Sequence, residues 1–320
     1  MLKYVAKRIL WLIPVLLGVT LLVFTIMYFT PGNPAMSALG AGATEEEIME
    51  FNVRHGLDGG YLKRLGGYMS SVFLHFDFGT SYMNESSVRG QIVSRLPYTL
   101  LVSYIGVALS LLIGIPLGVA AATHQNTWID SLTMVLAMFC ASMPSFWFAL
   151  ILVMCFSLRL GILPSIGADS WVCYIMPCLS IGVGGAAGIA RQTRSSMLEV
   201  IRQDYVTTAR AKGQKENKVI TSHCLRNGMI PVLTVVGGNM AALVGNSLVC
   251  ETIFSIPGIG SYMISGVNQR DMPVVLGCVI VLAFIFSLTM LVLDLLYTVV
   301  DPRLKTMFAT KKKVKKEAAA

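Results

Sequence analysis

Six long apolar segments constrain the fold of this chain more than any other feature. Five of them contain no charged residue, and the sixth contains only Asp294. A helix that crosses a membrane needs about 20 apolar residues, and the charged share of 13% is about half that of soluble domains. The sequence therefore predicts an all-α membrane protein with six transmembrane helices. The segments cover residues 9–29, 98–122, 132–158, 175–190, 229–250 and 274–300.

The distribution of basic residues predicts that both termini are cytoplasmic. With six spans and the N-terminus inside, the inner segments hold 18 of the 25 lysines and arginines, as short cytoplasmic loops do. The outer segment 30–97 is net acidic. Without the glycine-rich fourth span, the weakest in hydropathy, the two ends would lie on opposite sides of the membrane.

The first apolar segment has two interpretations. Lys3, Lys7 and Arg8 precede it, as basic residues precede the apolar stretch of a secretory signal. That stretch is usually about 7–15 residues long and ends in a small-x-small cleavage site. This segment is longer and has no such site before Pro31, so an uncleaved first span is the preferred interpretation.

The sequence predicts four parts along the chain. Residues 1–29 form a cytoplasmic N-terminus and the first span, and residues 30–97 form a small helical extracytoplasmic subdomain. Within it, Thr44 followed by three glutamates is typical of a helix-capping box. Residues 98–300 form a five-span core that includes an inner loop at 191–228, and residues 301–320 form a basic cytoplasmic tail that can touch anionic lipid.

Small residues and prolines predict how the spans pack. Gly114 and Gly118, and likewise Gly184 and Gly188, are one helical turn apart and let helix backbones approach closely. Pro144 lies in the middle of the third span, where a kink serves either gating or static packing.

Motifs for catalysis or metal binding are missing from the sequence. It has no phosphate-binding loop, no nucleophile elbow and no HExxH motif, and no metal site is expected from its four scattered histidines. Cys173 and Cys178 can pair, but the seven cysteines are interpreted as small apolar residues. A chain with six spans and no motif for ATP hydrolysis is expected to form a pore that another protein drives. The alternative is a secondary carrier that works alone, and its only support is the ionisable Asp294 within a span.

The inner loop is the most informative soluble segment. In residues 195–206, apolar positions recur among polar ones at the spacing of an amphipathic helix. A further helical turn is predicted to end at Gly213, and a second, basic helix to begin at Gln214. Such a loop is either a lever between two spans or a basic helix on anionic headgroups, and composition does not separate these two.

Motifs along the whole chain resemble one family. The inner loop carries DYVTTARAKG at 204–213, followed by HCLRN at 223–227 and Pro231. Other stretches agree: TPGNPA at 30–35, GLD at 56–58, DFGTS at 77–81, RLPYTL at 95–100, ILP at 162–164, ETIFSIPGIG at 251–260, RDMPVV at 270–275 and DPR at 301–303. Together they resemble the ABC importer permeases of the peptide/nickel group.

The resemblance implies a type I ABC importer permease in the bacterial inner membrane. Such a chain pairs with a second, similar permease, two cytoplasmic ATPases and an extracytoplasmic binding protein, in contact with membrane lipid and without nucleic acid. It is not itself an enzyme and holds no cofactor, since ATP and Mg²⁺ belong to the ATPases. The implied ATPase-coupling residues are Asp204, Tyr205, Thr208, Ala209, Arg210, Ala211, Lys212 and Gly213, with an apolar face of the loop for the ATPase groove and Arg210 and Lys212 for its acidic residues.

The resemblance also narrows the substrate. Short peptides are the first choice, since GADSW at 167–171 is similar to glutathione and dipeptide members of the group; nickel or a metal chelate is the alternative. Polar or soft side chains within the spans are candidates for the translocation pathway. They are Ser142, Asn239, Met240, Asn246 and Ser247.

Overall fold

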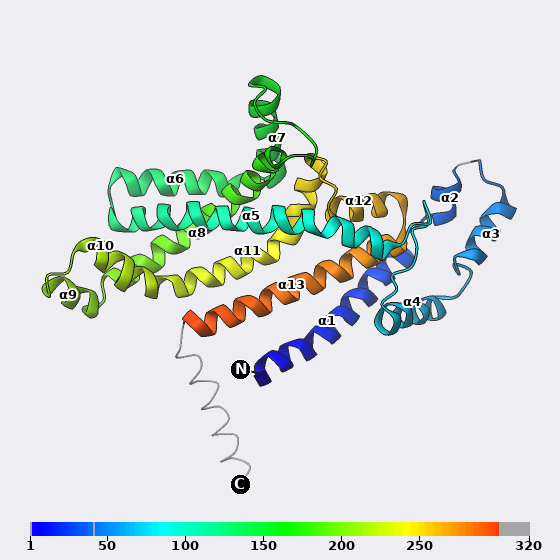
Figure 1. The fold of residues 1–320 in the computed structure, drawn as a ribbon, viewed down its shortest axis with the longest axis horizontal. Coiled ribbons are helices and arrows are strands. Elements are labelled where there is room, and N and C mark those ends of the chain that lie inside the picture. The colour runs from blue at the N-terminus through cyan, green and yellow to red at the C-terminus, as the bar shows by residue number, and fades with distance from the viewer. Residues whose placement is uncertain (1, 41, 301–320) are drawn as a thin grey trace, which may run out of the picture. The chain divides into compact units, whose positions relative to one another are not determined.

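The computed structural model describes residues 2–40 and 42–300, with side chains at all of these positions except 2–4, 230, 239, 241–246 and 296–300. The predicted tail 301–320 lies outside the described residues. The described chain is helical, with one isolated β-bridge between Thr80 and Ser87 (Figure 1). In order, the helices are α1 (Leu2–Phe29), α2 (Pro34–Leu39), α3 (Glu45–Arg54), α4 (Tyr61–His75), α5 (Val88–Thr123), α6 (Trp128–Ser142), α7 (Ser145–Leu152), η1 (Val153–Arg159), η2 (Trp171–Tyr174), α8 (Ile175–Ile201), α9 (Asp204–Ala211), α10 (Glu216–Lys218), η3 (Val219–Cys224), α11 (Leu225–Ile253), α12 (Ile259–Gln269) and α13 (Met272–Val300).

The predicted spans correspond to four single helices and to two bent pairs of helices. Four are long and apolar enough to cross a membrane: Val5–Phe29, Val88–Thr123, Trp171–Ile201 and Met272–Leu295. The third and fifth spans are bent pairs of helices, so the total reaches six only if each pair is one span. The glycine-rich fourth segment is confirmed as a membrane-length helix, and it has the largest buried share of the four. Its low hydropathy agrees with that burial, because small residues let helices pack closely on one another.

The third span is broken at Pro144. The axes of the two helices on either side of the break meet at 101°. Met143 has the extended backbone (ψ 129°) that a following proline imposes. The predicted interruption is confirmed, and its size makes this segment either a broken span or a re-entrant loop.

Two helix ends differ from those that the sequence predicts. α5 begins at Val88, ten residues before the predicted second span, because Val88 and Ile92 are buried in a core with Ile259 and Val274. Packing thus extends the helix through a polar stretch that hydropathy excludes. The helix predicted over 195–206 is interrupted, since α8 ends at Ile201 and α9 starts at Asp204.

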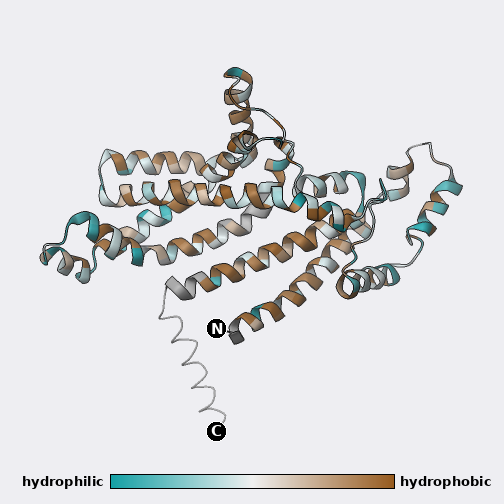
Figure 2. Ribbon diagram, in the orientation of Figure 1, coloured by the Kyte–Doolittle hydropathy of each residue, from teal (hydrophilic) through white to brown (hydrophobic). Residues whose placement is uncertain are grey.

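The helices predicted in segment 30–97 are present as α2, α3 and α4. The Thr44 hydroxyl accepts a hydrogen bond from the Glu47 amide (3.3 Å), and the Glu47 carboxylate accepts one from the Thr44 amide (2.8 Å). This confirms the capping box. α4 packs on α1 through Val72, which is buried beside Leu16. Figure 2 shows hydrophobic residues along α1 and α13 and hydrophilic residues on α3.

The chain divides into two compact units, which are described separately. The first contains Met1–Ser103, Phe156–Tyr174 and Val244–Ser287, and the second contains Tyr104–Cys155, Ile175–Leu243 and Leu288–Ala320, within the described residues. In the second unit, α5 packs closely on α8: a Cβ atom placed on Gly114 or Gly118 would lie 2.7 or 2.6 Å from the carbonyl oxygens of Ala186 and Ala190. The predicted close approach at Gly114 and Gly118 is therefore confirmed.

Candidate functional site

The inner loop folds as a short helix held between two turns. Gln203 has an extended backbone (φ −78°, ψ 146°) and separates α9 from the end of α8. Asp204 is the first residue of α9, where the positive end of the helix dipole stabilises its carboxylate. Gly213 follows with φ +75°, a left-handed conformation that suits glycine. The predicted glycine stop is confirmed, and α10 then begins at Glu216 rather than Gln214.

One face of α9 is buried inside the chain itself. Val206 and Ala209 pack with Met197 of α8, Ala122 at the end of α5 and Cys224 of η3. The apolar face expected to enter an ATPase groove is therefore already covered by the second unit. α9 therefore packs on the end of α5 and on the C-terminal part of α8.

The opposite face of α9 is exposed. Tyr205, Thr208, Ala211 and Lys212 lie there, as does Asp204 at its start. These side chains form the outward face of α9. Ala209 is the one predicted coupling residue of the helix that lies inside.

Two polar contacts hold α9 in this orientation. The Arg210 Nη2 atom lies 2.7 Å from the Glu216 Oε1 atom, and this carboxylate raises the pKa of Arg210. The Asn227 amide donates to the Tyr205 hydroxyl at 2.8 Å. Arg210, predicted to meet an acid of the ATPase, thus has an acid in its own chain, whereas Lys212 has no ion pair within the described residues.

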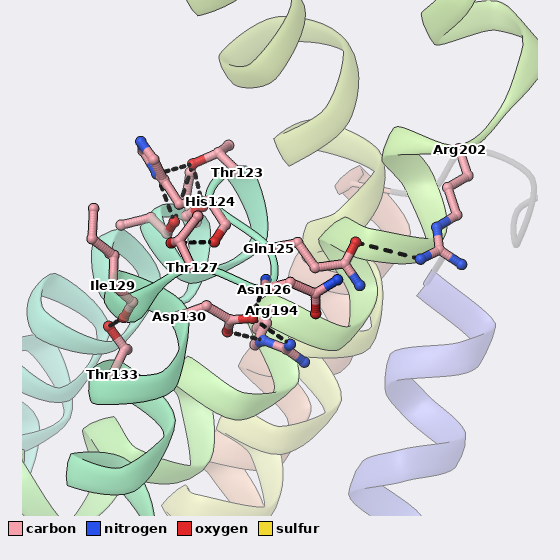
Figure 3. Close-up of polar contacts among 12 residues, drawn as sticks. Thr123, His124, Gln125, Asn126, Thr127, Ile129, Asp130, Thr133, Arg194 and Arg202 are labelled. Carbon is pink, nitrogen blue, oxygen red and sulfur yellow. Dashed lines mark hydrogen bonds and ion pairs between the residues drawn. The ribbon is translucent and has the colours of Figure 1, made fainter.

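A buried ion pair joins α6 to α8 close to the loop (Figure 3). The Arg194 guanidinium contacts both carboxylate oxygens of Asp130, with 2.7 Å between Nη2 and Oδ2. The Asp130 side chain is 6% exposed and that of Arg194 is 26% exposed. Oδ2 of Asp130 also accepts the amide of Asn126 (3.1 Å), so one carboxylate holds both the α5–α6 turn and α8.

A second contact reinforces this connection. The Arg202 guanidinium donates to the Gln125 side chain at 3.4 Å, and Figure 3 shows the two residues reaching toward each other from the end of α8 and the α5–α6 turn. Sequence reasoning missed both contacts. The only available signal was a single aspartate, Asp130, in an inner turn without basic residues.

The structure places the predicted pathway residues on two helices. Ser142 ends α6, where its hydroxyl donates to the Met138 carbonyl at 2.8 Å. On α11, Met240 is half-buried and Ser247 is buried. The side chains of Asn239 and Asn246 lie outside the described residues. The pathway therefore stays a prediction.

The described residues contain no group of three or more His, Cys, Asp or Glu side chains that could hold a metal ion. Cys173 and Cys178 are not joined by a disulfide bond.

Two family models match the chain. The model described as "Binding-protein-dependent transport system inner membrane component" covers residues 114–306, and the model of its N-terminal part covers residues 1–103. The chain belongs to this family. The match contains α9 and the Asp130–Arg194 pair, so both lie in the part that defines the family.

Individual relatives agree over nearly the full length. The chain is 39% identical to the "Dipeptide transport system permease protein DppB" of Alkalihalophilus pseudofirmus, over 95% of this chain and 100% of the relative. It is 41% identical to the "Glutathione transport system permease protein GsiC" of Salmonella typhimurium, over 95% and 99%.

Solved structures confirm the fold. A chain of an inward-facing form of the MetNI methionine ABC transporter has a TM-score of 0.54 at 17% identity, covering 66% of this chain and 96% of that one. A chain of an amino acid ABC transporter has a TM-score of 0.50 at 15% identity, covering 67% and 94%. The fold is that of a type I ABC importer permease.

Proposed function

We propose that this chain is the transmembrane permease subunit of an ATP-driven importer of short peptides. The observation that carries the proposal is near full-length similarity to permeases named for dipeptide and glutathione transport. Nickel or a metal chelate is the alternative cargo. No contact seen in the described residues favours the metal over the peptide.

The outward face of α9 is the part of the chain that docks on the ATPase. Tyr205, Thr208, Ala211 and Lys212 are exposed there, and Lys212 is the basic residue available for an acidic partner. Arg210, Ala209 and Gly213 act by holding the shape of the loop, because they are paired, buried or in the left-handed turn. Coupling therefore depends on exposed side chains that contact the ATPase and on others that hold the loop in shape.

Movement of the ATPase is passed to the spans through packed contacts. Val206 and Ala209 join α9 to the ends of α5 and α8, and close packing at Gly114 and Gly118 joins α5 to α8 along their length. The Asp130–Arg194 pair adds α6. Since packed interfaces transmit displacement rather than absorb it, α5, α6 and α8 move with α9 as one body.

The remaining parts of the machine belong to other chains. Two cytoplasmic ATPases bind ATP and Mg²⁺ and carry out hydrolysis, a second and similar permease completes the pore, and an extracytoplasmic binding protein delivers the cargo. This chain lies in the bacterial inner membrane with both termini in the cytoplasm. That orientation places α9 on the side of the ATPases and segment 30–97 on the side of the binding protein.

Uptake by the reconstituted transporter tests the proposal. Vesicles holding both permeases, both ATPases and the binding protein are expected to accumulate a labelled dipeptide only with ATP. Lys212→Glu is expected to reduce uptake and ATPase association, because it reverses the charge offered to the partner. Lys218→Glu is the matched control, since Lys218 is exposed in the same loop but outside α9.

Three outcomes contradict the proposal. Uptake of nickel without uptake of peptide would change the cargo. Transport by the purified chain without any ATPase would establish a secondary carrier. Equal losses of uptake and ATPase association in the Lys212→Glu and Lys218→Glu variants would show that α9 is not the docking surface.

A further inference from the structure

A cavity of about 440 Å³ opens in the first unit. It lies among α1, α4, the end of α3 and the start of α13, on the side predicted to be extracytoplasmic. Cavities that hold small ligands measure about 300–1,000 Å³. Its walls include the basic residues Arg54, Lys63 and Arg64 and the acidic residues Asp58 and Asp77.

Arg64 is the unusual member of this cavity. It is half-buried, and the side chains that contact it, Tyr28, Met272 and Tyr82, are all uncharged. The guanidinium carbon lies 5.2 Å from the centre of the Tyr28 ring, and Nη2 donates to the Met272 sulfur at 3.7 Å. A thioether is a weak acceptor, and a partly buried guanidinium usually has a carboxylate or phosphate partner.

The phenols next to Arg64 do not supply that counter-charge. Burial raises the pKa of Tyr82 to about 12, even with Arg64 beside it, so Tyr82 is neutral at physiological pH. Tyr68 follows Arg64 by one helical turn on α4 and so lies on the same face. Its buried hydroxyl has no hydrogen-bond partner in the described chain. The cavity wall formed by α4 therefore offers donors without an acceptor.

The other charged residues of the cavity differ from Arg64. Arg54 lies 3.0 Å from Glu85, and the Asp77 carboxylate accepts the Gly79 amide at 2.9 Å. Lys63 and Asp58 have no ion pair in the described part of the chain. Charges of both signs thus remain available in one cavity, a combination that suits a zwitterion.

Gly67 keeps the cavity open. It lies inside α4, where glycine is unfavourable for helix stability, and it lines the cavity. A Cβ atom added there would meet nothing within 4 Å. Gly66, its neighbour on the same helix, is equally unobstructed but does not line the cavity.

We propose that this cavity binds a short peptide through its carboxylate, with Arg64 as the main donor. The inference rests on the proposed function, since it takes the cargo class from there. The cavity holds the peptide at residues of the first unit, and none of these residues belongs to α9. Asp58 and Asp77 supply negative charge for the amino group.

Binding of labelled dialanine tests this site. The permeases and ATPases are placed in lipid nanodiscs without ATP and without the binding protein. Saturable binding is expected, weakened about tenfold or more by Arg64→Gln, since one hydrogen bond to a charged group contributes about that factor. Dialanine amide, which lacks the carboxylate, is expected to bind about tenfold or more weakly for the same reason.

Filling the cavity provides a second and independent arm. Gly67→Leu is expected to abolish binding without unfolding α4, because leucine favours helix more than glycine does. Gly66→Leu is the matched control and is expected to bind as the unmodified chain does. Absence of saturable binding, equal binding of the amide, or unchanged binding by Gly67→Leu would each overturn the proposal.

ATP-driven uptake by the complete transporter, measured in parallel, separates this proposal from the proposed function. Uptake of dipeptide without dialanine binding in the nanodiscs would overturn the cavity site alone. Loss of uptake by the unmodified complex would overturn the proposed function as well. Rescue of binding only by addition of the binding protein would assign the carboxylate site to that protein and also overturn the proposal.

Discussion

The Asp130–Arg194 pair offers the most quantitative test of how the second unit is held together. Asp130→Asn removes the charge but keeps a carbonyl oxygen for the Asn126 amide, so it isolates the ion pair. Breaking a fully buried pair costs about 3–5 kcal/mol, and an exposed pair contributes about 0–1 kcal/mol. With side-chain exposures of 6% and 26%, the expected loss lies between these limits, at about 1–3 kcal/mol.

A double-mutant cycle measures this loss directly. Asp130→Asn, Arg194→Gln and the double variant are unfolded in mixed detergent micelles, and the free energy of unfolding is compared with that of the unmodified chain. The double variant is expected to lose less than the two single variants together, with a coupling energy of about 1–3 kcal/mol. Peptide uptake is expected to fall in both single variants, because α6 no longer moves with α8.

The matched control is Gln125→Ala, which removes only the longer contact to Arg202 (3.4 Å). It is expected to change stability by less than about 0.5 kcal/mol, as most surface substitutions do. Additive effects of Asp130→Asn and Arg194→Gln would refute the reasoning, because the pair would then contribute nothing beyond its separate residues.

Two further predictions concern packing and capping. Gly118→Leu is expected to destabilise the chain by about 1–3 kcal/mol or more, as overpacking does, because its Cβ would lie 2.6 Å from a backbone oxygen of α8; Gly188→Leu, whose Cβ meets nothing within 4 Å, is expected to be tolerated in the same unfolding assay. Thr44→Ala is expected to weaken the start of α3 by about 1 kcal/mol, measured as faster amide hydrogen exchange in that helix. Since Thr44 lowers the pKa of Glu47, the Glu47 half of the capping box is present at neutral pH and is lost as the pH falls through that lowered pKa. Protection factors of the α3 amides, corrected for intrinsic exchange, that are the same at pH 7 and pH 3 would contradict this contribution.

Features that depend on neighbouring residues could be predicted from the sequence. The Thr44 capping box, the glycine turn at Gly213 and the break at Pro144 each follow from one residue type and its local backbone preference. The apolar segments follow from hydropathy summed over a span. The capping box, the glycine turn and the break were confirmed. Four apolar segments are single membrane-length helices and two are bent pairs of helices. The start of α5 differs from the start of the apolar segment because it depends on where Val88 packs.

Features that depend on distant residues could not be predicted. Asp130 and Arg194 are 64 residues apart, and nothing near either residue indicates its partner. The amphipathic pattern of the inner loop showed that one face is apolar. The sequence does not show whether this apolar face, Val206 and Ala209, packs within the chain or on the ATPase. The answer depends on the ends of α5 and α8, which pack against these two residues.

The cavity beside Arg64 is a similar case. Its lining residues come from five separate stretches of the chain, and the sequence identified none of them as a site. The one local signal was the pair of glycines, Gly66 and Gly67, inside a segment with helical periodicity. Glycine inside a helix is unfavourable, and only the structure shows that Gly67 leaves space for the cavity.

Site-specific photo-crosslinking is the most direct test of ATPase docking on α9. A photoreactive amino acid is placed at Thr208, on the outward face of α9, and at Ser70, which is equally exposed on α4, in the complete transporter in membranes. The crosslinked product at Thr208 is expected to contain the ATPase and to change in yield when ATP is bound, while Ser70 gives no ATPase product. No ATPase crosslink at Thr208, or an equal yield at both positions, would contradict docking on this face.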